Sequence, residues 1–250
     1  MLRYPKLLAF VAGLVSATGF APLGLWPLTL LALALLLHLV RESRTGRAAF
    51  ARGYSFALGH FILGLNWIAG AFQYQSAMPA WLGWIAVIGL SLYLALLPAM
   101  ALLIGWRTAR KWRDAAFIAL IAGLWIVAEL VRATLFTGFA WNPLAAAFVG
   151  SADAARLVGS YGVSGLVVIV SGALWLAAKK QWRAAAFALG LPAALSLAGG
   201  LGPALTPPPQ RPNAPLLRIV QPNIGQQDKH VASFDVLNFQ KLAEHTGMPG

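Results

Sequence analysis

Cysteine is absent from this chain of 250 residues, and acidic residues are scarce, with seven Asp and Glu against 19 Lys and Arg. Without cysteine, the chain can form no disulfide, no thiolate metal site and no cysteine nucleophile. The four histidines lie far apart, at positions 38, 60, 230 and 245, and show no spacing typical of a zinc site. We therefore expect neither a metal nor another cofactor.

Charge of either sign is also scarce. Only 10% of the residues are charged, whereas soluble domains have about 25%, and 59% are hydrophobic. This composition is typical of an integral membrane protein. The net charge of +12 would suit a nucleic-acid binder only if the bases covered one face of a soluble domain. They lie instead in short clusters between apolar runs, so we expect no nucleic-acid partner.

Seven apolar runs are candidates for crossing about 30 Å of hydrocarbon. They cover residues 6–21, 26–40, 51–71, 81–106, 115–135, 158–178 and 184–201. The first two are short and are separated by APLGLWP, whose Pro22, Gly24 and Pro27 break a continuous helix. We interpret them as a tight hairpin of two spans, with a cleavable signal peptide as the alternative. The predicted fold class is an α-helical, polytopic membrane protein with about seven transmembrane helices.

The placement of Lys and Arg predicts the orientation of these runs. Thirteen of the 19 fall on one side if every run spans the membrane, and only Arg132 and Arg156 fall in the opposite loops before the last run ends. The thirteen are Arg3, Lys6, Arg41, Arg44, Arg47, Arg52, Arg107, Arg110, Lys111, Arg113, Lys179, Lys180 and Arg183. Because Lys and Arg concentrate in cytoplasmic loops, we expect a cytoplasmic N-terminus and an exit on the outer side after the seventh span.

The chain changes character after the last apolar run. Residues 203–215, PALTPPPQRPNAP, are typical of a semi-rigid, Pro-rich linker. Beyond it, Leu217, Ile219 and Val220 indicate a strand, and residues 233–244 indicate an amphipathic helix. One strand and one helix cannot bury a core alone, so we expect the start of a larger domain. The predicted units are a membrane domain (1–202), the linker, and a truncated outer domain (216–250).

Two ionisable residues lie inside the fifth apolar run. Glu129 and Arg132 are three positions apart, so they share one helix face and can pair. Charges at membrane depth are costly and often functional. Two interpretations stay open: a structural ion pair, or a lipid site in which Arg132 meets a headgroup phosphate.

Polar and aromatic residues also gather at the predicted outer ends of the spans. Trp141 and Asn142 lie in the non-helical segment TGFAWNP, and Asn66 and Trp67 lie near the end of the third run. Tryptophan is typical of the membrane interface, so an ordinary aromatic belt and a functional rim are both consistent with these positions. His60, earlier in the third run, is more typical of a packing histidine than of a proton carrier.

Five segments occur in order along the chain and together resemble one known family. They are GFAPLGLWPL, GLNWI, AELVRATLFTGFAWNP, LVGSYGVSGLVVIV and VQPNIGQQDK. Each segment alone is weakly specific. Their order and the predicted orientation make the chain similar to the bacterial apolipoprotein N-acyltransferases.

The resemblance implies a helical domain in the bacterial inner membrane, a periplasmic nitrilase-like domain and one closing helix. It implies transfer of an acyl chain from a phospholipid, through a cysteine thiolate, to the α-amino group of a diacylglyceryl-modified lipoprotein. The family's catalytic glutamate, lysine and cysteine fall beyond the part that this chain matches, so we expect the chain alone to be inactive. His230 stands where the family commonly has a tryptophan that guards the mouth of the active site.

On this interpretation the partners are a phospholipid acyl donor, lipoproteins and membrane lipids. The candidate lipid- or substrate-binding residues are Glu129, Arg132, Trp141, Asn142, Asn66, Trp67 and His230. Two other functions stay open. A transporter would use the embedded charges and the broken helices, although no inverted repeat is visible. A non-catalytic membrane partner would hold another enzyme.

Overall fold

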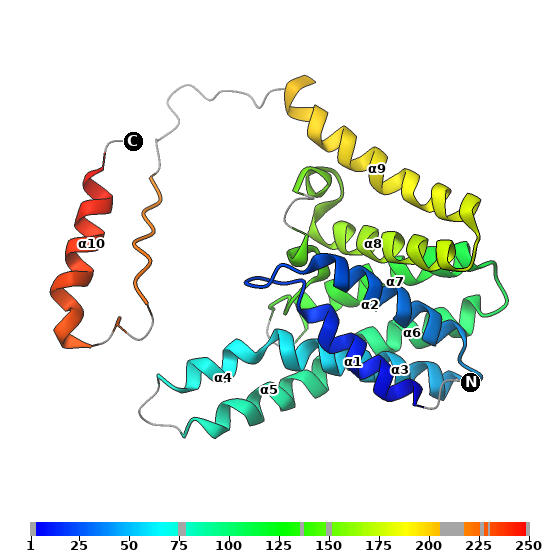
Figure 1. The fold of residues 1–250 in the computed structure, drawn as a ribbon, viewed down its shortest axis with the longest axis horizontal. Helices are drawn as coiled ribbons and strands as arrows, with labels where there is room; N and C mark the ends of the chain where they lie inside the picture. The colour runs from blue at the N-terminus through cyan, green and yellow to red at the C-terminus, as the bar shows by residue number, and fades with distance from the viewer. Residues whose placement is uncertain are drawn as a thin grey trace.

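The computed structural model describes residues 4–74, 79–135, 138–148, 152–205, 218–225, 228–229 and 231–248. These residues form α-helices and contain no β-strand. In chain order the elements are α1 (Pro5–Ala17), α2 (Trp26–Arg41), α3 (Gly46–Gly64), α4 (Asn66–Phe72), α5 (Trp81–Leu94), α6 (Leu96–Ala109), α7 (Asp114–Thr134), η1 (Leu144–Ala147), α8 (Ala152–Ala178), α9 (Trp182–Leu205), η3 (Ala232–Phe234) and α10 (Asp235–Gly247). Figure 1 shows α1 to α3 and α6 to α8 gathered into one bundle.

All seven predicted apolar runs fall on helices. Five helical stretches are long and apolar enough to cross a membrane: Gly46–Phe72, Trp81–Ala109, Asp114–Thr134, Asp153–Ala178 and Trp182–Leu201. The first two helices are apolar but have only 13 and 16 residues, fewer than the about 20 that a span needs. The chain is therefore a helical membrane protein whose described residues include five helical stretches of spanning length. The count of seven spans stays a prediction.

Two of the long stretches are interrupted once. The first is bent at Leu65, between α3 and α4 (Figure 1). The second is interrupted at Ala95, between α5 and α6, where the backbone stays helical. Near this point Pro98 has no N–H for the carbonyl of Leu94, so one helical hydrogen bond is lost. Helices α4 and α5 project from the bundle as a pair (Figure 1). We call this pair the aromatic hairpin, because Trp67, Trp81 and Trp84 are exposed on it.

Helices α1 and α3 pack closely against each other. A Cβ added to Gly13 would overlap the backbone carbonyl of Phe56, and one added to Gly59 would overlap that of Phe10. Each glycine thus lets the backbone of the other helix approach directly, as small residues do in membrane bundles. The bundle core beyond this contact is built from Leu, Ala, Phe and Ile side chains.

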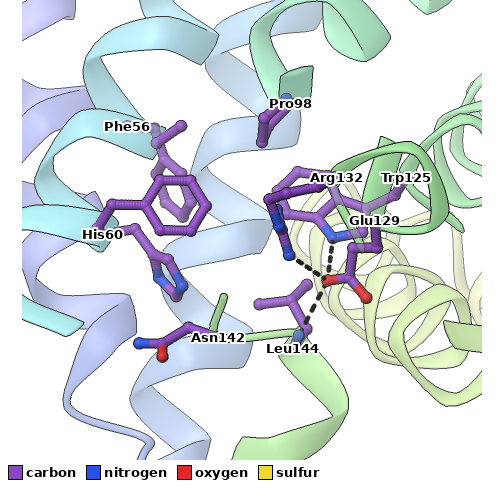
Figure 2. A pocket seen from close by; sticks show the side chains of 10 residues that line it. Phe56, His60, Pro98, Trp125, Glu129, Arg132, Asn142 and Leu144 are labelled. Carbon is purple, nitrogen blue, oxygen red and sulfur yellow. Dashed lines mark hydrogen bonds and ion pairs between the residues drawn. The ribbon is translucent and has the colours of Figure 1, made fainter. Parts of the chain in front are cut away.

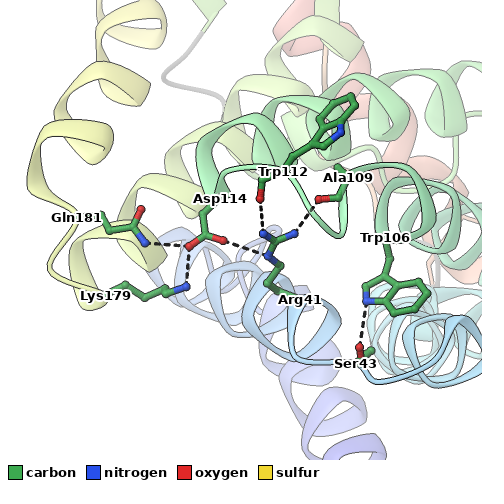
Figure 3. Close-up of polar contacts among 8 residues, drawn as sticks. All are labelled: Arg41, Ser43, Trp106, Ala109, Trp112, Asp114, Lys179 and Gln181. Atoms are coloured by element: carbon green, nitrogen blue, oxygen red, sulfur yellow. Dashed lines mark hydrogen bonds and ion pairs between the residues drawn. The ribbon is translucent and has the colours of Figure 1, made fainter.

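One end of the bundle is tied together by Asp114, the first residue of α7. Its carboxylate accepts hydrogen bonds from Arg41 Nε at 3.0 Å, Lys179 Nζ at 2.6 Å and Gln181 Nε2 at 2.9 Å (Figure 3). Arg41 also donates to two backbone oxygens at and just after the end of α6. Asp114 therefore joins α2 and α7 to the turn between α8 and α9. These contacts bring three of the predicted basic clusters to the same end of the bundle.

The C-terminal part of the chain differs from the prediction in two respects. Residues 203–205, predicted as the start of the linker, belong to α9, which ends at Leu205. The helix predicted at 233–244 is present as α10, and none of its residues is buried. The described residues 218–220 form no strand, because a strand requires a hydrogen-bonded neighbour and none is present among the described residues. Leu217, His230 and linker residues 206–215 lie outside the described residues. The nitrilase-like domain and its boundaries stay predictions.

We expect Gly13→Ala to lower the free energy of unfolding by about 1–3 kcal/mol, because the new methyl group overlaps backbone atoms that cannot move aside. Gly123→Ala on α7 is the matched control, since a Cβ there meets nothing within 4 Å. Unfolding of the two purified variants in detergent, followed by circular dichroism, compares them. Equal destabilisation of both variants would contradict the close contact between α1 and α3.

Candidate functional site

The C-terminal half of α7 carries a buried ion pair. Glu129 and Arg132 are only 1% and 3% exposed, and Arg132 Nη2 lies 3.6 Å from Glu129 Oε1. Figure 2 shows the two side chains facing each other inside the bundle, with Trp125 beside them. Trp125 Nε1 donates to Glu129 Oε1 at 3.1 Å, and the Arg132 guanidinium lies over the Phe61 ring at 5.2 Å. The spacing of the two charges predicted their pairing, and the structure confirms it.

Both charged side chains also bind the backbone of the segment that follows α7. Glu129 Oε1 accepts a hydrogen bond from Leu144 N at 2.9 Å, and Arg132 Nε donates to Ala140 O at 2.9 Å. We call residues 138–148 the α7–α8 loop. Because its backbone groups meet charged partners on α7, the course of the loop is set from inside the bundle.

Asn142 connects the same loop to the bend between α3 and α4. Its Nδ2 donates to Gly64 O at 2.9 Å, and a Cβ on Gly64 would overlap the Asn142 side chain. Trp141 and Asn142 have φ values of 42° and 49°, in the left-handed region that costs a non-glycine residue about 1 kcal/mol or more. A strained backbone persists only where its surroundings hold it. We call Glu129, Arg132 and the half-buried Asn142 the polar cluster.

The space around this cluster is too small for a substrate. His60, Arg132, Asn142 and Leu144 line a cavity of about 10 Å³, which is the lower limit for one water molecule. Within the described part of the chain, Glu129 Oε2 and Arg132 Nη2 are buried and have no hydrogen-bond partner. In this arrangement Arg132 is enclosed by protein, and no phospholipid headgroup fits beside it.

The remaining candidate residues lie nearer the surface. Asn66 and Trp67 are exposed on the aromatic hairpin, where 56% of Trp67 is accessible. Trp141 is half-buried and packs against a cluster that includes Phe61, and its ring lies edge-on to exposed Phe139 at 4.9 Å. The structure thus places Glu129, Arg132 and Asn142 together against the bundle, whereas Asn66 and Trp67 lie on the outside. His230 lies outside the described residues.

Sequence reasoning missed several partners of these residues. Trp125 had a signal, because it lies four positions before Glu129 and so shares its helix face. Gly64 and Ser164 had none, because they reach the loop only through the tertiary fold; Ser164 Oγ accepts from Ala145 N at 3.0 Å. His60 is buried with Nδ1 2.7 Å from Ser16 Oγ, which agrees with the predicted packing role.

Comparisons with known protein families and with individual proteins all match apolipoprotein N-acyltransferases. Residues 12–173 match the family described as "Apolipoprotein N-acyltransferase N-terminal domain". An apolipoprotein N-acyltransferase of Nitrosomonas europaea is 38% identical over 174 residues, covering 68% of this chain and 34% of the relative. The corresponding protein of Caulobacter vibrioides is 37% identical over 235 residues (89% and 42%), and that of Rhodopseudomonas palustris 31% over 248 residues (92% and 45%). The chain therefore spans from a third to just under half the length of these relatives.

We expect Arg132→Met to lower the free energy of unfolding by about 3–5 kcal/mol, because Glu129 would remain buried without its counter-charge. The double variant Glu129→Leu/Arg132→Met should lose less than the sum of the two single variants, since no lone charge remains. Denaturant unfolding in mixed micelles measures all three variants. Arg156→Met, at an exposed arginine of α8, is the control for removing a positive charge. Strictly additive losses would rule out an energetic coupling between Glu129 and Arg132.

Proposed function

This chain belongs to the apolipoprotein N-acyltransferase family, and we propose that it forms the membrane part of an enzyme that acylates lipoproteins. The complete protein would move an acyl chain from a phospholipid to the amino group of an N-terminal diacylglyceryl-cysteine. The match over residues 12–173 carries this proposal, together with relatives of the same name. In this proposal residues 1–202 are the membrane domain, and residues 216–250 begin a nitrilase-like domain.

The sidedness follows from the basic residues. The end of the bundle that holds Arg41, Asp114 and Lys179 would face the cytoplasm of a bacterial inner membrane. The α7–α8 loop and the aromatic hairpin would then face the periplasm. Residues 216–250 would lie on that same side, where the acyl transfer takes place.

This chain supplies only some of the groups that the acyl transfer requires. Acyl transfer through a thioester needs a thiolate that attacks the phospholipid ester and releases the lysophospholipid. The lipoprotein amine then attacks the thioester, which forms the amide and releases the thiol. The chain has no cysteine, so its residues supply no such thiolate. Its contribution would be to receive the lipid and to hold a surface against which the reacting groups meet.

We assign this contribution to the rim formed by the α7–α8 loop and the aromatic hairpin. Phe139 and Trp67 expose aromatic rings there, and such rings suit the headgroup level of a bilayer. The Asn142 hydrogen bond to Gly64 O links the loop to the base of the hairpin, so the two are held in one arrangement. Residues on the rim would touch lipid, while the polar cluster behind it would position them.

The individual candidates then have different roles. Asn66 and Trp67 would contact phospholipid or lipoprotein directly, because both are exposed. Glu129, Arg132 and Asn142 would act as positioning residues that set the shape of the loop, with Trp141 packed between them and the surface. His230 remains a candidate for contact with a headgroup, through an imidazole that is amphipathic.

The proposal predicts that the 250-residue chain is inactive alone but functional as part of a complete enzyme. In bacteria depleted of their own N-acyltransferase, the chain should fail to restore growth or lipoprotein acylation. A fusion of residues 1–202 to the remaining part of the Caulobacter vibrioides relative should restore both. Mass spectrometry of lipoprotein N-terminal peptides reads out the third acyl chain. A folded and membrane-inserted fusion that leaves lipoproteins diacylated would contradict the proposal.

In that fusion we expect Trp67→Ser to reduce acyl transfer several-fold, because the rim loses a ring that contacts lipid. Thermal stability should change little, since Trp67 is 56% exposed. Trp182→Ser is the matched control: this ring is 65% exposed but begins α9, at the end that holds Asp114. Turnover of a phospholipid donor by purified protein distinguishes the two. The same loss of acyl transfer in both variants would mean that the rim has no specific role in the reaction.

A further inference from the structure

The end of the bundle that holds Asp114 contains a cleft to which the acylation proposal gives no role. Helices α1, α2 and α3 enclose it, and its volume is about 520 Å³. The lining residues are Pro5, His38, Leu39, Glu42, Arg44, Ala48 and Arg52. We call it the basic cleft, because two arginines and one acidic residue are among the residues that line it. Its size lies within the range of pockets that bind small molecules.

Hydrogen bonds to the backbone hold the walls of this cleft in place. Arg52, on α3, donates through Nη1 to the backbone oxygen of Leu39 near the end of α2. Ser43 Oγ donates to the same oxygen at 3.2 Å, and Thr45 caps α3 by accepting from Ala48 N at 3.2 Å. The turn between α2 and α3 is therefore fixed, and Arg52 is half-buried within the wall. These bonds hold the α2 and α3 walls of the cleft in one arrangement.

The neighbouring Arg41 has a different role, which separates it from the cleft. Its guanidinium binds Asp114 and two backbone oxygens. Arg41 does not line the cleft. Arg44 is exposed and lines the cleft, whereas Arg47, one turn farther along, is exposed and does not line it. Of the arginines at this end of α2 and α3, only Arg44 and Arg52 are among the residues that line the basic cleft.

The chemistry of the lining suits a phosphate group. Guanidinium groups bind phosphate oxygens through paired N–H donors, and the first turn of α3 adds a favourable helix dipole. Glu42 opposes an anion but is outnumbered by Arg44 and Arg52. A singly charged phosphodiester is therefore a better match than a multiply charged anion.

The position of the cleft favours a lipid over a soluble phosphate. It lies where α1 begins, α2 ends and α3 begins, which is the level at which apolar helices meet headgroups. Pro5, Leu39 and Ala48 give it apolar walls. The outer face of α1 exposes Leu7 and Val11, which offer a surface to acyl chains.

We propose that the basic cleft binds the phosphate of an anionic phospholipid, in the leaflet opposite the acylation rim. The lipid would join the ends of α1, α2 and α3 in the way that Asp114 joins α2, α7 and the turn before α9. This site is separate from the proposed acyl donor site. The proposed lipid site can be tested without the acyltransferase activity, because lipid binding is measured on this chain in the absence of turnover.

Native mass spectrometry of the purified chain tests the site, with detergent micelles that contain phosphatidylglycerol or phosphatidylcholine at physiological salt, which screens diffuse attraction. We expect one retained phosphatidylglycerol and markedly less phosphatidylcholine. Arg44→Gln should weaken retention about tenfold, the loss of one charge-assisted hydrogen bond. The control Arg47→Gln should leave it nearly unchanged, and Glu42→Gln should strengthen it by removing a like charge.

Three outcomes would overturn the proposal. Equal losses in Arg44→Gln and Arg47→Gln would mean a diffuse attraction of the whole basic end. Equal retention of the two lipids would mean that the cleft does not select an anion. Complete displacement of phosphatidylglycerol by millimolar inorganic phosphate would mean a site for free phosphate. Thermal unfolding of each variant, without added lipid, establishes that a weakened variant is still folded.

Discussion

The ion pair between Glu129 and Arg132 is the constraint on which the outer end of this structure depends. Two charges inside an apolar bundle are costly unless each is paired and hydrogen-bonded. Here part of the required bonding comes from the backbone of the α7–α8 loop, at Leu144 N and Ala140 O. The loop must therefore return across the end of α7. Once it does so, Asn142 reaches Gly64 O, and the strained backbone at this point is held between two helices.

Acidic residues are few in this chain, and two of them accept hydrogen bonds from several parts of the fold. Two of the seven, Asp114 and Glu129, lie near opposite ends of α7, and each collects donors from several elements. Apolar packing between helices is weakly directional in a membrane, whereas hydrogen-bonded carboxylates specify which groups must meet. Asp114 fixes the basic end and Glu129 fixes the loop end. This division fits a domain whose two ends meet different partners.

Much of the helical framework was predictable, and the contacts within it were not. Apolar run length located the helices, and the three-residue spacing of Glu129 and Arg132 predicted their pairing. The bend at Leu65 and the interruption at Ala95 were missed, because hydropathy does not distinguish an interrupted helix from a continuous one, although Pro98 was a local signal for the second. The burial of Arg132 was left open, between a structural ion pair and a lipid site, since one sequence cannot tell an interface arginine from an enclosed one. Asp114 gave no signal, because its partners lie far away in the chain.

The most direct test of this account is amide hydrogen exchange in Glu129→Leu, which removes the acceptor of Leu144 N while leaving a side chain of similar volume. If the ion pair determines the course of the loop, the Leu144 amide should exchange about tenfold faster than in the unmodified chain. The Ala48 amide, bound to Thr45 at the other end of the bundle, should keep its rate. An unchanged rate at Leu144 would mean that the loop holds its shape without the pair, and that Glu129 and Arg132 do not determine its course.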